Sequence, residues 1–300
     1  MLAIIIVNYK NEEQTISFIH KELSQVSLPN MVIVVNNEAT TESDAVLVKE
    51  LQAELITDIS RYSTSKKIFI VSHPVNLGYA KGNNLGVEFA VKHFDIEYFV
   101  FSNNDIRFIE DETIERLVAK FKELPSSVAA IGPAILGLNG EKQSPIIYLS
   151  FFTKWVLGRW YTPFLSKKQR INFYKIDFEN ITEGRYYTLM GSFLLVKAKI
   201  FLACGMFDPN TFLFGEEAIL AERLARVNKT MYYYPQVTIL HEHSVTINKY
   251  NNHIKKIRMM FDSDIYYYKT YKSISTFNIV FCWMMVNFHY VLWNMKEKFK

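Results

Sequence analysis

Short apolar runs alternate with amphipathic segments along most of the chain. Uninterrupted apolar runs predict strands that are buried on both faces, as in a parallel sheet, at 2–7, 31–35, 67–71 and 98–101. Apolar residues at helical spacing predict helices at 12–25 and 40–55 between the first three runs. This β-α-β-α-β order favours a parallel sheet with right-handed crossovers.

The pattern continues into the second half of the chain. Further apolar runs predict strands at 128–131, 187–196 and 237–240. A helix is expected to begin near Glu217 and to run to about Asn228. Gly191 lies inside the predicted strand 187–196, and a glycine within a strand permits close approach of another group to the backbone.

Composition narrows the classes of function. The 300 residues could form one large α/β domain or two smaller ones, and a hydrophobic content of 49% suffices for a sizeable core. The net charge of +4 is too small for a protein built to bind nucleic acid. Cys204 and Cys282 form neither a metal-binding spacing nor a disulfide framework, and the first residues do not have the pattern of a signal peptide. We therefore expect a cytoplasmic protein.

A cluster of oxygen donors follows the predicted strand 98–101. Asn103, Asn104 and Asp105 come directly after it, and ligands of open α/β sheets bind beyond the carboxyl ends of the strands. A carboxylate with neighbouring amides suits a divalent cation that is bound to a substrate diphosphate. The alternative is an ordinary turn, in which Asn, Asp and Ser are common.

A glycine-containing loop between Asn76 and Gly86 precedes a predicted helix. Its glycines Gly78 and Gly82 would let backbone N–H groups approach a phosphate. The spacing fits neither the dinucleotide-binding motif nor the P-loop. The alternative is a loop that only caps the helix.

A carboxylate falls on the apolar face of the helix predicted after residue 216. Glu217, Leu220, Ala221 and Leu224 are spaced as one helical stripe. An enclosed carboxylate is suited to proton transfer, so Glu217 is the candidate general base. Glu216 is the alternative inward group.

Six short motifs occur in a fixed order. They are Asn8-Tyr9, the Val-Val-Asn-Asn run around Asn36, Asn76 to Asn84, Asn103-Asn104-Asp105, the Phe-Leu-Phe-Gly-Glu-Glu run ending at Glu217, and His241 followed by Thr246. In this order the chain resembles the family-2 glycosyltransferases, especially the bacterial rhamnosyltransferase-like branch, over residues 2 to 246.

The resemblance implies the GT-A fold, an α/β domain that binds a nucleotide sugar. It implies transfer of a sugar from a dTDP- or UDP-linked donor with inversion, in bacterial surface polysaccharide synthesis. Asp105 would bind Mg²⁺ or Mn²⁺, with His241 as a second metal or diphosphate contact, and Glu217 would be the base beside Glu216. The expected donor-binding residues are Asn8, Tyr9, Asn36, Asn76, Gly78, Asn84, Asn103, Asn104 and Arg223.

The chain departs from the family pattern at several of these positions. Asn36 stands where an Asp usually contacts the base of the nucleotide, and Asn103 replaces the first Asp of the Asp-x-Asp element. The base is Glu217 rather than Asp, and Ile219 replaces a frequent acidic residue. These departures leave two alternatives open: a nucleotidyltransferase, or a non-catalytic module that binds a sugar or glycolipid on a decayed transferase fold.

The last part of the chain is rich in aromatic residues. We expect a catalytic domain at 1–246 and a helical extension at 247–300 that contacts a membrane or forms an oligomer. The segment 277–293 is slightly short for a spanning helix, and its aromatic residues and flanking lysines favour an interfacial position. The aromatic and basic residues of the insertion 151–173 would add to this contact with the membrane interface. This predicts a peripheral protein at the inner face of the cell membrane that acts on a glycan or polyprenyl-linked acceptor. The alternative is a helix packed on the domain or at a dimer contact.

Overall fold

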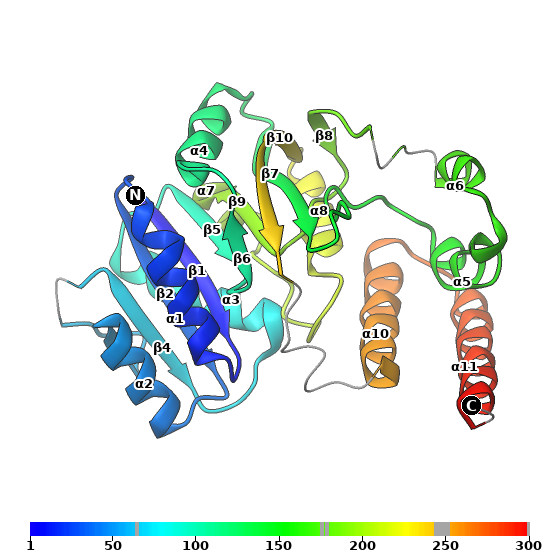
Figure 1. The fold of residues 1–300 in the computed structure, drawn as a ribbon, viewed down its shortest axis with the longest axis horizontal. Coiled ribbons are helices and arrows are strands. Elements are labelled where there is room, and N and C mark those ends of the chain that lie inside the picture. The colour runs from blue at the N-terminus through cyan, green and yellow to red at the C-terminus, as the bar shows by residue number, and fades with distance from the viewer. Residues whose placement is uncertain (64–65, 175–176, 178–179, 243–252, 299–300) are drawn as a thin grey trace.

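The computed structural model describes residues 1–63, 66–174, 177, 180–242 and 253–298. The described residues form a ten-stranded sheet with helices on both faces (Figure 1). The strand order is β3-β4-β2-β1-β5-β9-β7-β10-β6, and β8 pairs with β10. The predicted α/β architecture is therefore confirmed, although the sheet is mixed rather than wholly parallel.

The amino-terminal half contains the parallel part of the sheet. Its strands are β1 (Leu2–Asn8), β2 (Asn30–Asn37), β3 (Glu54–Ile56), β4 (Ile68–His73) and β5 (Tyr98–Ser102), all parallel to their neighbours in this group. The connecting helices are α1 (Glu12–Lys21), α2 (Thr41–Leu51) and α3 (Gly78–His93), with a short 3₁₀ turn, η1 (Leu23–Gln25), after α1. The carboxyl ends of these strands consequently meet at one edge.

The second half adds antiparallel strands. After β6 (Ile106–Phe108) and α4 (Thr113–Glu123), β7 (Val128–Gly137) and β10 (Thr230–His241) pair in parallel, and β9 (Phe193–Lys197) lies antiparallel between β5 and β7. The strands β6 and β8 (Gly184–Tyr186) are antiparallel to β10. The remaining helices of this half are α7 (Ala198–Ala203) and α8 (Glu216–Arg226).

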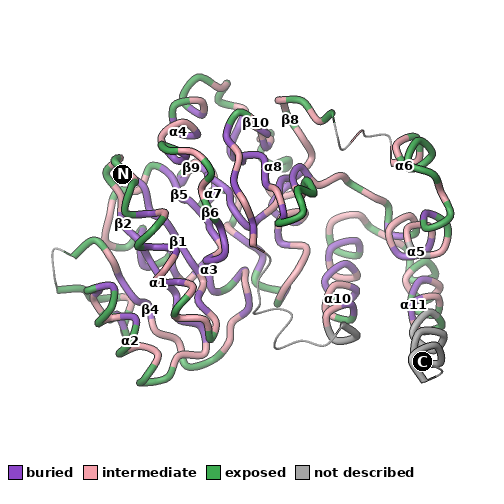
Figure 2. The backbone as a smooth tube through the Cα atoms, viewed as in Figure 1, coloured by how far each residue is buried: buried purple, intermediate pink, exposed green. Residues whose placement is uncertain are grey.

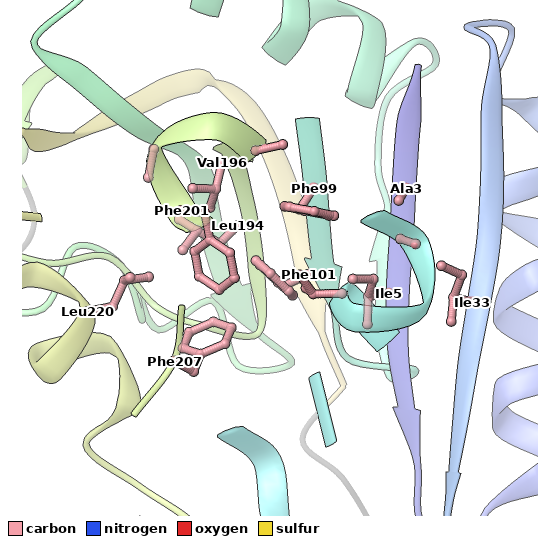
Figure 3. Packing of buried hydrophobic residues seen from close by; sticks show 14 of the residues in the cluster. Ala3, Ile5, Ile33, Phe99, Phe101, Leu194, Val196, Phe201, Phe207 and Leu220 are labelled. Atoms are coloured by element: carbon pink, nitrogen blue, oxygen red, sulfur yellow. The ribbon is translucent and has the colours of Figure 1, made fainter. Parts of the chain in front are cut away.

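Two hydrophobic cores cover the two faces of the sheet. Because side chains alternate along a strand, Ala3 and Ile5 belong to one core and Ile4 and Ile6 to the other. The first core packs under α3 and α7, where Phe99, Phe101 and Phe201 meet (Figure 3). The second packs under α1, α2 and α4. Figure 2 shows the buried residues concentrated along the strands, as the continuous apolar runs predict.

Several predicted element boundaries are wrong: α1 ends at Lys21, β7 continues to Gly137 and β10 begins at Thr230. The helix expected over 40–55 ends at Leu51, because Gln52 adopts a left-handed conformation (φ 50°) and the short strand β3 follows. The strand expected over 187–196 begins only at Phe193. Gly82 lies inside α3 rather than before it, where the absence of a side chain lets the helix approach Val7.

The insertion and the carboxy-terminal helices pack together beside the sheet. The insertion contains a π-helical turn, η2 (Thr153–Leu157), and the short helices α5 (Gly158–Trp160), η3 (Thr162–Phe164) and α6 (Lys167–Tyr174). The helices α10 (His253–Tyr271) and α11 (Thr276–Lys298) stand side by side in Figure 1. They share a third hydrophobic cluster with Phe151, Trp155 and Ile219. Among the described residues, no helix is long and apolar enough to cross a membrane.

We expect Gly86→Val to destabilise the fold. A Cβ atom at Gly86 would lie 2.8 Å from a methyl group of Ile5 and 3.2 Å from one of Val35, both fully buried in β1 and β2. Overpacking of this kind costs about 1–3 kcal/mol. Urea denaturation measures the loss, and Glu88→Val, at an exposed position of the same helix, controls for helix propensity. Equal stabilities of the two variants would contradict the prediction.

Candidate active site

A cavity of about 590 Å³ lies beyond the carboxyl ends of β1 and β5, and α8 and α10 contribute to its walls. It brings together most of the residues that the sequence singled out. Those lining it are Tyr9, Asn76, Gly78, Asn103, Asn104, Asp105, Glu216, Glu217 and His241. Segments far apart in the chain therefore converge at the sheet edge where ligands of α/β proteins bind.

Asn8, Asn36 and Asn84 do not line this cavity. The Asn84 side chain forms two hydrogen bonds with the backbone of Phe207. Its Nδ2 donates to the Phe207 carbonyl oxygen at 2.9 Å, and its Oδ1 accepts from the Phe207 amide at 3.2 Å. Asn8 and Asn36 are buried and are hydrogen-bonded to each other, with 2.9 Å between Nδ2 and Oδ1. Their side chains thus hold the framework of the site.

The Asn8–Asn36 pair belongs to a longer chain of hydrogen bonds along the sheet edge. Asn104 donates to Thr15 at 2.8 Å, and Thr15 donates to Asn8 at 2.8 Å. At the other end, Asn36 donates to Asp44 at 2.7 Å. This chain of hydrogen bonds ties the carboxyl ends of β5, β1 and β2 together, and it holds the backbone beside Asp105.

The start of α3 is fixed against the loop that leads into α8. Asn76 accepts hydrogen bonds from the Asn37 side chain at 3.0 Å and from the Gly78 amide at 2.9 Å. Gly78 has φ +78°, and a Cβ there would lie 2.2 Å from the carbonyl oxygen of Phe212. The Tyr79 amide donates to the same carbonyl at 2.9 Å. The glycine is required for this contact.

Arg223 also lies outside the cavity, and its contacts differ from those expected for a diphosphate ligand. Its guanidinium forms an ion pair with Asp208 at 3.0 Å and donates to the Tyr271 hydroxyl at 3.1 Å. Tyr266 and Tyr271 donate to the same Asp208 carboxylate at 3.0 and 2.6 Å. Arg223 therefore fastens α10 to α8.

Asp105 and His241 face each other across the strand ends. His241 Nε2 lies 3.2 Å from Asp105 Oδ1. Both Asp105 oxygens are buried, and among the described residues neither accepts a hydrogen bond. His241 Nδ1 lies 2.8 Å from the carboxamide oxygen of Gln143. Because that oxygen only accepts, Nδ1 is the donor of this contact, and Nε2 is the ring nitrogen that faces Asp105.

This arrangement fits a divalent cation. A carboxylate and an imidazole are both common ligands of divalent metal ions. Within the described part of the chain, no cluster of three or more His, Cys, Asp or Glu side chains could hold a metal. Asp105 and His241 alone leave coordination positions for substrate oxygens, and Mg²⁺ is commonly bound by one or two carboxylates together with substrate phosphates.

Glu216 and Glu217 open α8 at the opposite wall. Gly215 precedes them with φ +88°, which turns the chain into the helix. Glu217 Oε1 accepts a hydrogen bond from the Gly191 amide at 3.0 Å, and the Gly191 carbonyl accepts one from the Tyr79 hydroxyl at 2.6 Å. Glu216 is 3% exposed, and its Oε1 is buried without a hydrogen-bond partner among the described residues.

Burial keeps this carboxyl pair from ionising fully. Desolvation, reinforced by the charge of Glu217, raises the pKa of Glu216 to about 8. Desolvation also raises the pKa of Glu217, against the hydrogen bond from Gly191 and the charge of Lys154, which both lower it. Near neutral pH the pair can thus hold one proton and present one carboxylate, the state that a general base requires.

Several cavity residues were missed by the sequence analysis. They are Asn37, Tyr79, Tyr148, Lys154, Tyr187, Thr188, Ser192, Lys256, Asp264, Tyr267 and Tyr268. The sequence analysis noted that Gly191 permits another group to approach the backbone closely, but it did not identify Glu217 as that group. No local motif marks Asp264, whose place depends on how α10 packs. His243, Thr246 and the domain boundary at 246 lie outside the described residues.

A family model described as "Glycosyl transferase family 2" matches residues 3–181, more than half of the chain. The chain belongs to glycosyl transferase family 2. The matched range contains Asp105 but ends before Glu216 and Glu217. The family part of the predicted resemblance is thereby confirmed, and the strand order described above is that of the GT-A fold shared with the solved structures below.

One curated relative is the low-salt glycan biosynthesis hexosyltransferase Agl10 of Haloferax volcanii, which is 25% identical over 229 residues. The match covers 76% of this chain and 62% of the relative, so the chain spans less than two thirds of that protein's length.

Solved structures with the same fold include two enzymes crystallised with Mn²⁺. The mannosyltransferase PcManGT from Pyrobaculum calidifontis, in complex with GDP-Man and Mn²⁺, has a TM-score of 0.56 at 13% identity and covers 88% of this chain and 64% of its own. GalNAc-T7 with UDP, GalNAc and Mn²⁺ has a TM-score of 0.52 at 11% identity, and the match covers 81% of this chain and 44% of that chain. The structure of residues 1–349 of S. aureus TarS has a TM-score of 0.51 at 13% identity, and the match covers 89% of this chain and 72% of that chain.

Gly191→Ala should impair turnover more than stability. A Cβ at this position would lie 2.7 Å from Glu217 Oε1, the mobile end of a side chain, so the carboxylate would move rather than the backbone. A displacement of about 1 Å can cost on the order of 10²-fold in rate. The assay is nucleoside diphosphate release from a panel of nucleotide sugars, together with the melting temperature.

Gly132→Ala is the matched control. Its Cβ would lie 3.1 Å from a methyl group of Leu189 in the core, so it should lower stability and leave turnover per folded molecule unchanged. Full turnover by Gly191→Ala would show that the Gly191 amide does not position a working carboxylate.

Proposed function

We propose that this protein is an inverting glycosyltransferase that moves a sugar from a nucleoside-diphosphate donor to a glycan or lipid-linked acceptor. The observation that carries the proposal is one cavity with two unlike walls. One wall holds Asp105 and His241, whose carboxylate and imidazole are groups that bind divalent cations, and the other holds the carboxyl pair Glu216 and Glu217. The first suits a metal-bound diphosphate and the second suits removal of an acceptor proton.

Glu217 is our candidate for the base. The Gly191 amide fixes one carboxylate oxygen, so the side chain has a defined direction before substrate arrives. The carboxylate accepts the proton of the acceptor hydroxyl while that oxygen attacks the anomeric carbon. A single displacement of this kind inverts the configuration. Glu216 shares the proton equilibrium of the pair.

Asp105 and His241 would hold Mg²⁺ or Mn²⁺. When bound, such an ion stabilises the negative charge of the leaving nucleoside diphosphate. Asn103 lies beside His241, with 3.5 Å between Asn103 Nδ2 and His241 Nε2. Gln143 orients the imidazole ring, as outer partners of metal-binding histidines do.

The donor is proposed to be dTDP- or UDP-linked, in the rhamnosyltransferase-like branch that builds bacterial surface polysaccharide. The order of the short motifs supports this branch. Asn36, the expected contact to the nucleotide base, directs its side chain to Asn8 and Asp44. Asn37 and Asn76 line the cavity and offer amide groups instead.

We also propose a peripheral contact with the inner face of the cell membrane, through α11. One side of α11 packs through Cys282 and Val286 on the insertion. The other side leaves Phe277, Trp283 and Phe288 at 78%, 54% and 54% exposure. The helix has no charged residue before Lys296. Aromatic residues favour the interface of a bilayer, and the basic helix α6 lies within the same insertion.

Nucleotide binding should depend on a divalent metal. The free energy of binding UDP, dTDP or GDP, measured by calorimetry, should improve by about 1.4 kcal/mol or more when Mn²⁺ replaces EDTA, which is a tenfold gain in affinity. Asp105→Asn should abolish this gain, whereas Asp111→Asn, at an exposed position, should keep it. Equal affinities of the wild type in Mn²⁺ and in EDTA would argue against the proposal.

The full chain should float with liposomes that contain anionic lipids. Phe277→Ser combined with Trp283→Ser should weaken flotation, because each removes apolar area that the membrane would bury. Val46→Ser combined with Leu55→Ser, at exposed apolar positions of α2 and β3, is the matched control. If the full chain stays in the soluble fraction, or if the control weakens flotation equally, α11 is not the membrane contact.

A further inference from the structure

An ion pair between the partly exposed Lys154 and the buried Asp264 joins the insertion to α10 at the wall of the cavity. Lys154 Nζ lies 2.9 Å from Asp264 Oδ1 and 2.7 Å from Oδ2. Trp155 donates its indole N–H to Asp264 Oδ2 at 2.7 Å. Asp264 is 4% exposed and Trp155 is 1% exposed. Each carboxylate oxygen therefore has a donor, and the Lys154 ammonium is held in one place.

The pair and the carboxyl groups of α8 contribute to the lining of one cavity. Lys154 and Asp264 line the same cavity as Glu216 and Glu217. The preceding residue of α10, Ser263, donates to the carbonyl oxygen of Leu213 at 2.9 Å, in the segment that leads into α8. This turn of α10 is thereby fixed against the entry to the catalytic helix, and the ammonium of Lys154 is fixed with it.

The charged and titratable groups that line the cavity come from many parts of the fold. They are Tyr9 after β1, Tyr79 from α3, Asp105 and His241 from the strand ends, Tyr148 from the segment before the insertion, Lys154 from the insertion, Tyr187 from the segment before β9, Glu216 and Glu217 from α8, and Lys256, Asp264, Tyr267 and Tyr268 from α10. Carboxylates outnumber ammonium groups in this set. Neither Glu216 nor Glu217 has an ion-pair partner among the described residues.

We propose that Lys154 is a positioning residue whose charge, oriented by Asp264, keeps one carboxylate of the Glu216–Glu217 pair ionised and ready to accept a proton. This inference rests on the proposed role of the pair as the base of the reaction. It gives the insertion and α10 a catalytic purpose, because together they supply a cation that the α/β domain lacks at this wall.

The direction of each effect follows from electrostatics. A nearby positive charge favours the carboxylate form and lowers the pKa of the pair, against the burial that raises it. The negative charge of Asp264 attenuates the field of Lys154. Removal of the Asp264 charge should therefore lower the pKa of the pair, and removal of the Lys154 charge should raise it.

Carboxyl titration in the full-length protein tests this without any substrate. Glutamate labelled with ¹³C at the δ-carboxyl reports protonation by NMR, and Glu216→Gln and Glu217→Gln assign the two signals. All test variants carry Asp264→Asn, so that no buried carboxylate is left unpaired when Lys154 is replaced. Asn can still accept the hydrogen bond from Trp155.

We expect Asp264→Asn to lower the midpoint of the titration relative to the wild type. In the Asp264→Asn protein, adding Lys154→Met should raise the titration midpoint by about 1 pH unit. Adding Lys154→Arg instead should leave the midpoint within about 0.3 pH units of the Asp264→Asn value, because the charge is kept. The matched control is Lys256→Met in the same background, which removes another ammonium from the lining of the same cavity, at a position about 12 Å before Asp264 along α10. It should move the midpoint by less than Lys154→Met.

The proposal is overturned if Lys154→Met leaves the midpoint of the Asp264→Asn protein unchanged, or if Lys256→Met moves it as far. A loss of stability without a shift would show that the ion pair only holds α10 in place. Because the readout is protonation, these results are independent of whether the protein transfers a sugar, which the nucleotide-binding experiment decides separately.

Discussion

The site depends first on a chain of side-chain hydrogen bonds at the carboxyl edge of the sheet. Asn104, Thr15, Asn8, Asn36 and Asp44 link the ends of β5, β1 and β2 through bonds of 2.7–2.9 Å. Buried amides are costly unless they are paired, so this network specifies one arrangement of the strand ends. Asp105 follows directly, and it reaches the cavity because its neighbour Asn104 is bound in this network.

A second constraint joins the two walls of the cavity. The Gly191 amide donates a hydrogen bond to Glu217, and the Gly191 carbonyl accepts one from the Tyr79 hydroxyl. The start of α3, the segment before β9 and the first turn of α8 are therefore held at fixed spacing. The insertion and α10 complete the wall through the Lys154–Asp264 pair. Sheet, helices and extension thus contribute to one cavity.

The sequence predicted those parts of the structure that depend on local pattern. Runs such as Ile4 to Val7 are apolar on both faces because two cores cover the sheet. Asp105, Glu217 and His241 line one cavity, and the sequence singled them out because they lie near the end of a strand or the start of a helix. Asn36 and Arg223 were given ligand roles from position alone, and position does not reveal that each bonds to a neighbour within the fold. Lys154 and Asp264 are about 110 residues apart, so only the packing of α10 brings them together.

The most direct test of the account compares Glu217→Gln with Glu216→Gln. The measurement is nucleoside diphosphate release from UDP-, dTDP- and GDP-sugars with Mn²⁺, alongside nucleotide affinity. We predict that Glu217→Gln loses turnover by about 10²–10⁴-fold, the usual contribution of a general base, and binds the nucleotide as the wild type does. We expect Glu216→Gln to retain more activity. An inactive Glu216→Gln beside an active Glu217→Gln would contradict the assignment of the base.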